Sequence, residues 1–290
     1  MRISSFLVQG RGSALADHIH SVTSVAVKAL VLYSLGADHT ALLNTIKNNG
    51  IRCPVYLTET YGIIGHDVAS GKNIELMEKG RGSEYGFRGG SGGRGCLVVA
   101  YDGDDVTSGT TADFPAGVEN LLVVADTSGS FGKVADDAPL HYGGITKECF
   151  VALSPGGDDV VVPRRVPYFW VGSRTPVGIS AFGDDAGVAA ESLLGKIPDK
   201  VRASGDVGLF PCFSRGVNQY GVENVESDAI GGVMKKPRVY GMFAHGELGP
   251  VSFAGFSNES TSQTKIDFTQ HSGMSILAIH TESDSLGGDL

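Results

Sequence analysis

The sequence has no long apolar run and few basic residues for its size. No uninterrupted apolar stretch approaches the ~18 residues that a membrane-spanning helix needs, and the first ten residues have no apolar core typical of a secretory signal. Lys and Arg number 23 against 32 Asp and Glu, which gives a formal net charge of −9. Basic residues cluster no further than the pairs at 164–165 and 235–236. We therefore expect a soluble, cytoplasmic protein that binds neither a membrane nor nucleic acid.

Signatures of metal, disulfide and common enzyme chemistry are also missing. The cysteines are Cys53, Cys96, Cys149 and Cys212, and no two of them form a C-x-x-C pair. This spacing is typical of neither a zinc site nor a thioredoxin motif, so we expect free thiols, no metal and no bound cofactor. The sequence contains no G-x-S-x-G elbow, no phosphate-binding P-loop and no H-E-x-x-H motif. These absences disfavour an enzyme without excluding one.

Glycine, in contrast, is abundant: 42 of the 290 residues, about double the usual ~7%. Some of it belongs to an internal repeat. The pattern V-Y-x5-G-x2-G begins at Val55 and returns at Val239, with every matched position offset by 184 residues (239 − 55 = 184). Because glycine takes positive φ without steric cost, the repeat predicts two copies of one backbone turn and a duplicated fold. Functional chemistry is then expected where the two copies meet.

Alternation of strand-like and helical segments predicts the fold class. We expect strands near 29–34, 96–101, 121–125, 149–153, 160–162, 207–213 and 274–280, and helices over 13–28, 40–47, 185–194 and 222–234. This order predicts a mixed α/β (α+β) fold. Its two duplicated halves, 1–145 and 146–290, each contribute mixed β-sheet and packed helices, and they join as one body. The glycine-rich segment 81–95 is expected to form a hairpin tip or a lid, and the tail 282–290 to fray.

Three segments of the second half resemble a known family. Phe-Pro-Cys-Phe-Ser-Arg-Gly at 210–216, Asn-Val-Glu-Ser-Asp-Ala at 224–229 and Tyr-Gly-Met-Phe-Ala-His-Gly-Glu-Leu-Gly-Pro at 240–250 resemble, in order and spacing, the carboxy-terminal FIST domain. Segments 29–34 and 58–65 resemble the amino-terminal FIST domain less closely. The sequence departs from the family pattern at Ser214, where a glycine is usual, and at Leu248, where isoleucine is usual.

The resemblance implies a ligand-sensing module of signalling proteins, for which amino acids and related small molecules are proposed ligands. FIST domains also occur in F-box adaptors of ubiquitin ligases. The sequence shows no leucine-rich helical F-box, so we expect an adaptor role to need a separate protein partner.

Arg215 and Glu247 are the leading candidates for ligand contacts. Each adjoins a glycine directly after a predicted strand, where open α/β folds place ligands. Arg215 can hold a carboxylate through paired hydrogen bonds and Glu247 can hold an ammonium, which together suit an amino acid. The alternative is that Arg215 and Glu247 pair with each other or cap the backbone. The full predicted ligand-binding set is Tyr61, Arg215, Gly216, Tyr220, Glu226, His245, Gly246 and Glu247.

Three residues are candidates for catalysis. A cation near Cys212 can lower its thiol pKa and make it a nucleophile, although a buried cysteine more often only packs. His245 and Glu247 can act as acid and base, although His245 can equally be an exposed turn residue. Their counterparts in the first copy are Tyr61 and Ile63, so the polar pair belongs to the second copy alone and predicts one site.

Two further residues can contribute to that site. Tyr220 can cover one face of a ligand. Glu226 can contact the ligand or simply place negative charge at a helix start.

The leading hypothesis is therefore a FIST protein that binds a small polar or amphipathic molecule between its halves. The alternatives are a cofactor-independent enzyme in the same cleft and a protein-interaction scaffold with a flat apolar surface.

Overall fold

The computed structural model describes residues 1–10, 15–21, 27–78, 93–111, 113–127, 140–153, 163–175, 177–183, 195, 206–234, 237–250, 268–271 and 273–280. Within these residues the chain forms two mixed β-sheets and a few short helices, which confirms the predicted α+β class. The expected elements at 160–162 and 185–194, most of the glycine-rich segment 81–95 and the tail 282–290 lie outside the described residues.

The larger sheet carries strands from nearly the whole chain. Its spatial order is β11 (Arg164–Val166), β10 (Glu148–Leu153), β3 (Val55–Glu59), β2 (Val27–Leu35), β6 (Gly95–Asp102), β1 (Arg2–Gln9), β4 (Gly62–Asp67), β15 (Val239–Met242), β14 (Val207–Pro211), β18 (Ser275–His280) and β13 (Val177–Phe182), with β5 (Lys72–Met77) attached to β4. The smaller sheet has the order β17 (Phe268–His271), β16 (Glu247–Pro250), β9 (Leu140–Thr146), β8 (Asn120–Asp126), β12 (Tyr168–Ser173) and β7 (Thr107–Gly109).

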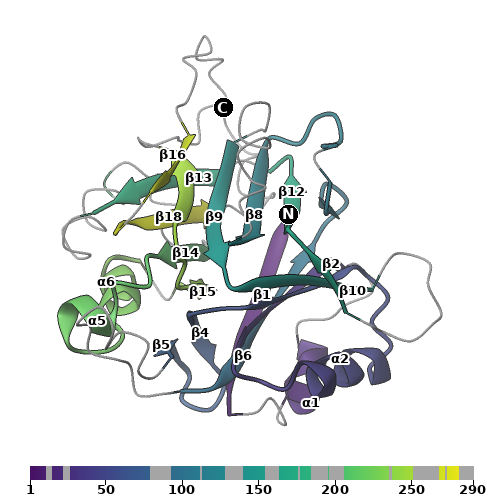
Figure 1. Cartoon of the computed structure of the whole chain (residues 1–290), viewed down its shortest axis with the longest axis horizontal. Coiled ribbons are helices and arrows are strands. Elements are labelled where there is room, and N and C mark those ends of the chain that lie inside the picture. Colours follow the sequence, from purple (N-terminus) through teal and green to yellow (C-terminus); the bar gives the residue numbers. More distant parts are fainter. Residues whose placement is uncertain are drawn as a thin grey trace.

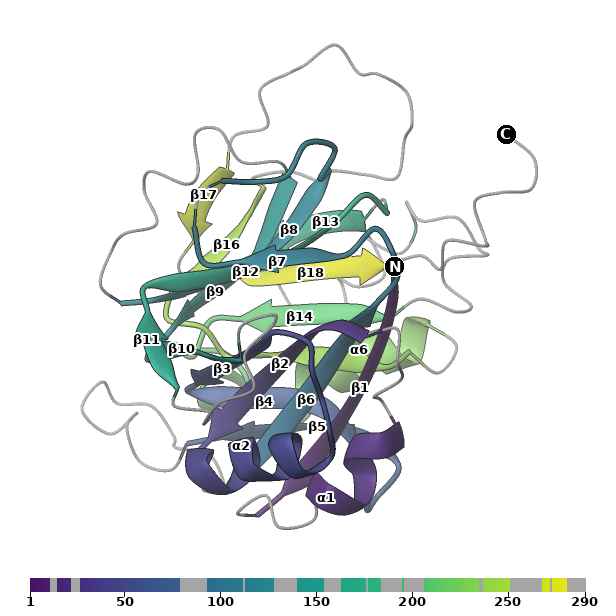
Figure 2. The same cartoon turned by 90° about the vertical axis from the view of Figure 1, so that its right-hand side faces the viewer.

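The layers follow from side chains that alternate across each strand. On β6, Leu97 and Val99 enter the core between the two sheets, whereas Cys96 and Val98 face the other side of the larger sheet. That other side is covered in the first half by α1 (Leu15–His18), the 3₁₀ turn η1 (Ile19–Ser21) and α2 (His39–Asn48). In the second half it is covered by α6 (Val225–Val233). For the first unit, Figure 2 shows this order from top to bottom: the smaller sheet, then β1, β2 and β6 of the larger sheet, then α1 and α2.

The topology repeats, as the sequence predicts. In the first unit β2 leads through α2 to the parallel strand β3, β6 pairs antiparallel with both β2 and β1, and β4 and β5 form a hairpin. In the second unit β14 leads through α6 to the parallel strand β15, β18 pairs antiparallel with both β14 and β13, and β16 and β17 form the hairpin. Val55 and Val239 are equivalent, because each opens its parallel ladder, opposite Leu30 and Val207 respectively. The matched units span 2–102 and 177–280, with β7–β12 between them.

The prediction of one shared glycine turn was wrong. Gly246 has φ +125°, but its counterpart Gly62 is not in a positive-φ conformation. Gly62 is instead a point of close approach, because a Cβ there would lie 2.7 Å from both the Leu76 carbonyl oxygen and the Phe243 ring. The two copies also diverge here: β4 stays in the larger sheet, while β16 crosses to the smaller one and pairs with β9.

Two helix predictions also need correction, and one is confirmed. The helix expected over 13–28 is only α1 and η1 in the described residues, and Val27 already starts β2. The helix expected over 222–234 begins only at Val225, as α6, because Asn224 is in the left-handed region; a separate short helix, α5 (Val217–Tyr220), precedes it and ends at the left-handed Gly221. Such residues break the helical hydrogen-bond ladder. The predicted α2 is confirmed, with the Asp38 carboxylate accepting a hydrogen bond from the Ala41 N–H.

Candidate functional site

The predicted site residues follow the carboxyl ends of the parallel strands β14 and β15. The ladder continues past these strands, because Cys212 bridges Ala244 and the Phe213 N–H donates to the Ala244 carbonyl oxygen at 2.8 Å. Immediately beyond, at Glu247, the chain enters β16 of the other sheet. In open α/β sheets this edge, where neighbouring chains diverge, is the usual place for a ligand.

The two copies of the repeat meet at this same edge. Strand β15 pairs antiparallel with β4, and the Phe243 N–H donates to the Gly62 carbonyl oxygen at 2.9 Å. The counterpart residues Tyr61 and His245 consequently lie with their ring centroids 5.8 Å apart. Phe213 completes the group, 5.5 Å from the Tyr61 ring and 5.2 Å from the His245 ring. His245 is exposed and the other two rings are half-buried, so the aromatic group has an accessible face.

Glu247 is fully buried and incompletely hydrogen bonded. Its Oε2 accepts a hydrogen bond of 3.3 Å from the Met274 N–H, but its Oε1 has no partner in the described part of the chain. Burial raises the pKa of Glu247 to about 7, although hydrogen bonds from Cys212 and from backbone N–H groups act in the opposite direction. A buried carboxylate oxygen without a donor is costly and uncommon in folded proteins. Ile63, the counterpart of Glu247, is an ordinary core residue.

Cys212 is buried beside this carboxylate. The Ser214 hydroxyl donates to its sulfur at 3.1 Å. Burial raises the pKa of the Cys212 thiol, and the negative charge of Glu247 raises it further. The thiol is therefore protonated at neutral pH, which favours the packing interpretation over the nucleophile.

Arg215 and Glu226 form a buried ion pair, and both side chains are fully shielded from solvent. Arg215 Nε donates to Glu226 Oε1, and Nη2 donates to the Tyr220 hydroxyl at 2.7 Å. The second oxygen, Glu226 Oε2, accepts a hydrogen bond of 2.7 Å from Ser275. Three predicted site residues, Arg215, Tyr220 and Glu226, thus bind one another in the interior.

Further contacts of Arg215 fix chain segments around the site. Nη1 donates to the carbonyl oxygens of Gly183 at 3.1 Å and Gly273 at 3.3 Å. The guanidinium also lies 5.6 Å from the Phe182 ring centroid. Arg215 therefore joins the end of β13, the start of β18 and helix α6. Its role here is support for the site.

Gly216 and Gly246 allow backbone conformations with positive φ. Gly216 has φ +58° at the start of α5, and a Cβ there would lie 2.8 Å from the Phe243 ring. Gly246 turns the chain into β16 with φ +125°. Residues other than glycine rarely adopt either of these backbone conformations.

Sequence reasoning missed another buried carboxylate, Glu75 on β5. Its Oε1 accepts a hydrogen bond of 2.8 Å from the Ser227 N–H in the first turn of α6, and its own N–H donates to Asn224 Oδ1 at 2.6 Å. Its Oε2 has no partner in the described residues. Burial raises the pKa of Glu75 to about 7. Glu75 and Ser227 are 152 residues apart in the sequence, so no local sequence pattern predicts their contact.

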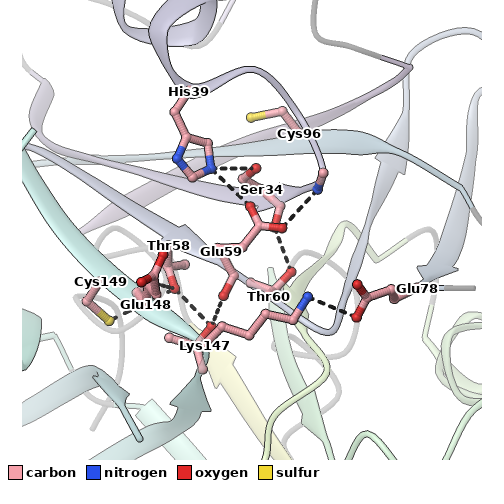
Figure 3. A network of polar contacts seen from close by, with 12 residues as sticks. Ser34, His39, Thr58, Glu59, Thr60, Glu78, Cys96, Lys147, Glu148 and Cys149 are labelled. Atoms are coloured by element: carbon pink, nitrogen blue, oxygen red, sulfur yellow. Dashed lines mark hydrogen bonds and ion pairs between the residues drawn. The ribbon is translucent and has the colours of Figure 1, made fainter. Parts of the chain in front are cut away.

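A polar network occupies the equivalent edge of the first unit, beyond β2 and β3 (Figure 3). His39 Nε2 lies 3.1 Å from Ser34 Oγ and 2.9 Å from Glu59 Oε2, and the Gly36 N–H donates to Glu59 Oε1 at 3.0 Å. Burial raises the pKa of Glu59, but hydrogen bonds from His39, Gly36 and Ser34 outweigh it and hold the pKa below its usual value. Both contacts use the same imidazole nitrogen and Ser34 is fully buried, so this is not the relay of a serine hydrolase. It fixes the start of α2.

The same network holds Lys147, another residue that sequence reasoning missed. Lys147 is the single residue between β9 and β10, and its N–H donates to the Glu59 carbonyl oxygen at 3.1 Å. Its side chain extends away from that contact to Glu78, where Nζ donates to Oε2 at 2.9 Å (Figure 3). Nζ also lies 5.1 Å from the Tyr61 ring centroid.

Surface hollows also lie elsewhere in the part of the chain that the structure describes. Two adjoining surface hollows of about 310 and 480 Å³ share Asp104, Asp105 and Arg174 and contain none of the predicted site residues. Among the residues that the structure describes, no group of three His, Cys, Asp or Glu side chains is placed to hold a metal ion, and no helix is long and apolar enough to cross a membrane. No family model matches the chain, and a search of curated proteins gives no significant match. Membership of the FIST family therefore stays a prediction.

Proposed function

We propose that this chain is a FIST-type sensory protein that binds a small molecule with an ammonium or similar cationic donor at Glu247. The observation that carries the proposal is the buried Glu247 carboxylate, whose Oε1 has no hydrogen-bond partner in the described residues. It lies beyond the carboxyl ends of two parallel strands, at the seam between the two units.

The chemistry of this carboxylate selects the ligand class. A desolvated carboxylate is strongly stabilised by a cation or by a charge-assisted hydrogen bond. The rings of Tyr61, Phe213 and His245 contact one another and are partly exposed at the same edge of the larger sheet, and in this proposal they contact the body of the ligand. Amino-acid-like and other amphipathic amines combine these two features. Because Arg215 is paired with Glu226, we now assign it to the support of the loops rather than to the ligand.

The experiment is a thermal-shift screen of amines and amino acids at pH 8, each compared with the matched acid or alcohol that lacks the amino group. A ligand present at 100 times its Kd stabilises the folded state by about 2.7 kcal/mol, which raises Tm by several degrees. Glu247→Gln is expected to abolish the shift. Glu75→Gln is the matched control, because Glu75 is equally buried and has an unpartnered oxygen but lies against α6.

The pH dependence gives a second readout. Only ionised Glu247 attracts an ammonium strongly, so affinity should rise about tenfold per pH unit below pH 7 and level off above it. Absence of any stabilising amine, or a shift that survives Glu247→Gln, overturns the proposal.

One observation favours an enzyme as the second candidate. A carboxyl with a pKa of about 7 suits general acid/base catalysis near neutral pH, and Glu247 has such a pKa. Cys212 is a poor nucleophile there, since its thiol pKa is raised. Turnover of a bound amine that disappears in Glu247→Gln, with binding of the corresponding product unchanged, would favour this candidate. For the scaffold alternative, Val222 is the one large hydrophobic side chain that is exposed among the described residues, which gives this alternative little support.

A further inference from the structure

The chain passes between the two sheets twice beside Glu247. It first leaves β15 of the larger sheet for β16 of the smaller one, and Glu247 is the first residue of β16. It later returns from β17 to β18 of the larger sheet through a turn that includes Gly273 and Met274. Glu247 also pairs through its backbone with His271, the last residue of β17. The returning turn is therefore placed to supply hydrogen-bond donors to the Glu247 carboxylate.

This turn supplies one backbone donor to Glu247. The Met274 N–H donates to Oε2 at 3.3 Å, and the contact favours the ionised carboxylate. Oε1, in contrast, has no partner in the described residues. A hydrogen bond of 3.3 Å is already longer than most N–H···O bonds, so a small displacement of Met274 is enough to break it. The charge state of Glu247 thus depends on where the turn is held.

The residues on both sides of Met274 are fixed by one buried ion pair. Gly273 has φ +75°, and its carbonyl oxygen accepts a hydrogen bond of 3.3 Å from Arg215 Nη1. The fully buried Ser275 donates from its hydroxyl to Glu226 Oε2 at 2.7 Å. Arg215 and Glu226 are bound to each other, so the two ends of the turn are held by the same pair. A continuous series of hydrogen bonds therefore connects this pair to Glu247.

We propose that Ser275 is a positioning residue for Glu247. Its hydrogen bond to Glu226 fixes the start of β18, so that the Met274 N–H reaches Oε2 and keeps the carboxylate ionised, while Oε1 is left for the ammonium of the ligand. The inference rests on the proposed function, and it assigns the charge of the ligand-binding carboxylate to a serine that does not touch the ligand.

The first test measures the titration of Glu247 and needs no ligand. In the full chain labelled with carbon-13 at the glutamate carboxyl carbons, the signal that disappears in Glu247→Gln identifies this residue. Ser275→Ala should raise its titration midpoint by about 0.4–1 pH unit, as for the loss of one hydrogen bond to the charged form. Ser275→Thr keeps the hydroxyl and should restore the midpoint.

Ser180→Ala is the matched control. Ser180 is also buried and lies in the same sheet, but its hydroxyl donates to the Ala181 carbonyl oxygen at 3.5 Å. Its removal should leave the titration of Glu247 unchanged.

The second test measures the binding of n-alkylamines of three to six carbons by calorimetry. At pH 7, Ser275→Ala should weaken their binding about two- to fivefold, because a higher pKa leaves less of Glu247 ionised. At pH 9 the difference should shrink, since Glu247 is then ionised in both proteins. A purely structural role of Ser275 would weaken binding equally at the two pH values.

The outcomes separate the two proposals. An unchanged Glu247 midpoint in Ser275→Ala, or an equal rise in Ser180→Ala, overturns the role of Ser275 and leaves the proposed function intact. If Ser275→Ala raises the midpoint but no amine binds the natural chain, the positioning of the carboxylate is supported and the proposed function is overturned.

Discussion

Removal of the Arg215 guanidinium should destabilise the protein as a whole. In Arg215→Met the side-chain volume is largely kept, but Glu226 stays fully buried without its cation, and Tyr220 and two carbonyl oxygens lose a donor. Breaking a buried ion pair by removing one partner costs about 3–5 kcal/mol. Since domains of ordinary stability have about 5–15 kcal/mol in total, this loss is a large fraction of the free energy of unfolding.

The assay is urea unfolding of a double-mutant cycle at pH 7.5. We expect Arg215→Met to lose about 3–5 kcal/mol and Glu226→Gln somewhat less, because the glutamine oxygen can still accept from Nε. The double variant Arg215→Met with Glu226→Gln carries no buried charge at this position, so it should be more stable than Arg215→Met alone. The coupling energy between the two residues should therefore reach about 2 kcal/mol or more. Additive losses, or an Arg215→Met variant within about 1 kcal/mol of the natural chain, would refute the assignment of Arg215 as a structural anchor.

Three further predictions concern stability and the thiols. The folded-state pKa of Glu75 is about 7, above the ordinary 4.5, so protonated Glu75 contributes to the free energy of unfolding below pH 4.5, and this contribution is lost as pH rises to 7. Glu75→Gln should therefore gain stability relative to the natural chain over that range, by up to about 3 kcal/mol. A difference in urea midpoints that does not change with pH would contradict this. In α6, Gly231→Ala meets open space and should stabilise by about 0.5–1 kcal/mol, whereas Gly62→Ala meets the Leu76 carbonyl oxygen and the Phe243 ring and should destabilise by about 1–3 kcal/mol; thermal unfolding that ranks the two in the opposite order would be evidence against the packing at the seam. Burial raises the pKa of all four thiols, so a thiol reagent at pH 7.4 should label them slowly in the folded protein and fully in urea, and rapid labelling of Cys212 without urea would restore the nucleophile hypothesis.

Local patterns in the sequence predict the elements well where the cause is local. The Asp38 cap and the spacing of Leu42, Leu43 and Ile46 place α2 correctly, because both act within a few residues of the helix. The buried strand run at 29–34 and the repeated Val-Tyr pair likewise predict β2 and the duplicated topology. Conversely, Gly221 and Asn224 are local breakers whose effect outweighs the helical pattern around them.

The sequence indicates which region of the fold holds the candidate residues, but it does not predict all of the side-chain pairs that they form. Cys212, His245 and Glu247 do gather where the two copies meet, as the repeat and the family resemblance suggest. The partner of Arg215 proved to be Glu226, whose place depends on the turn between α5 and α6. The contacts of Glu75 and Lys147 join segments up to 152 residues apart, and only the tertiary fold brings these segments together. The hydrophobic periodicity of the sequence does not predict such long-range pairs.

The order of strands in the larger sheet has a consequence for how the chain folds during synthesis. Within 2–102, β1 pairs with β6 and β4, β2 with β6 and β3, and β4 with β5, so the first unit can complete these ladders before the second is made. The contact between the two units forms later, because β4 can pair with β15 only after β15 has been made, and Glu247 follows β15 in the chain. Such long-range pairings form slowly. The candidate ligand-binding edge therefore forms only after most of the chain has been made, and β17 and β18 complete the two sheets later still.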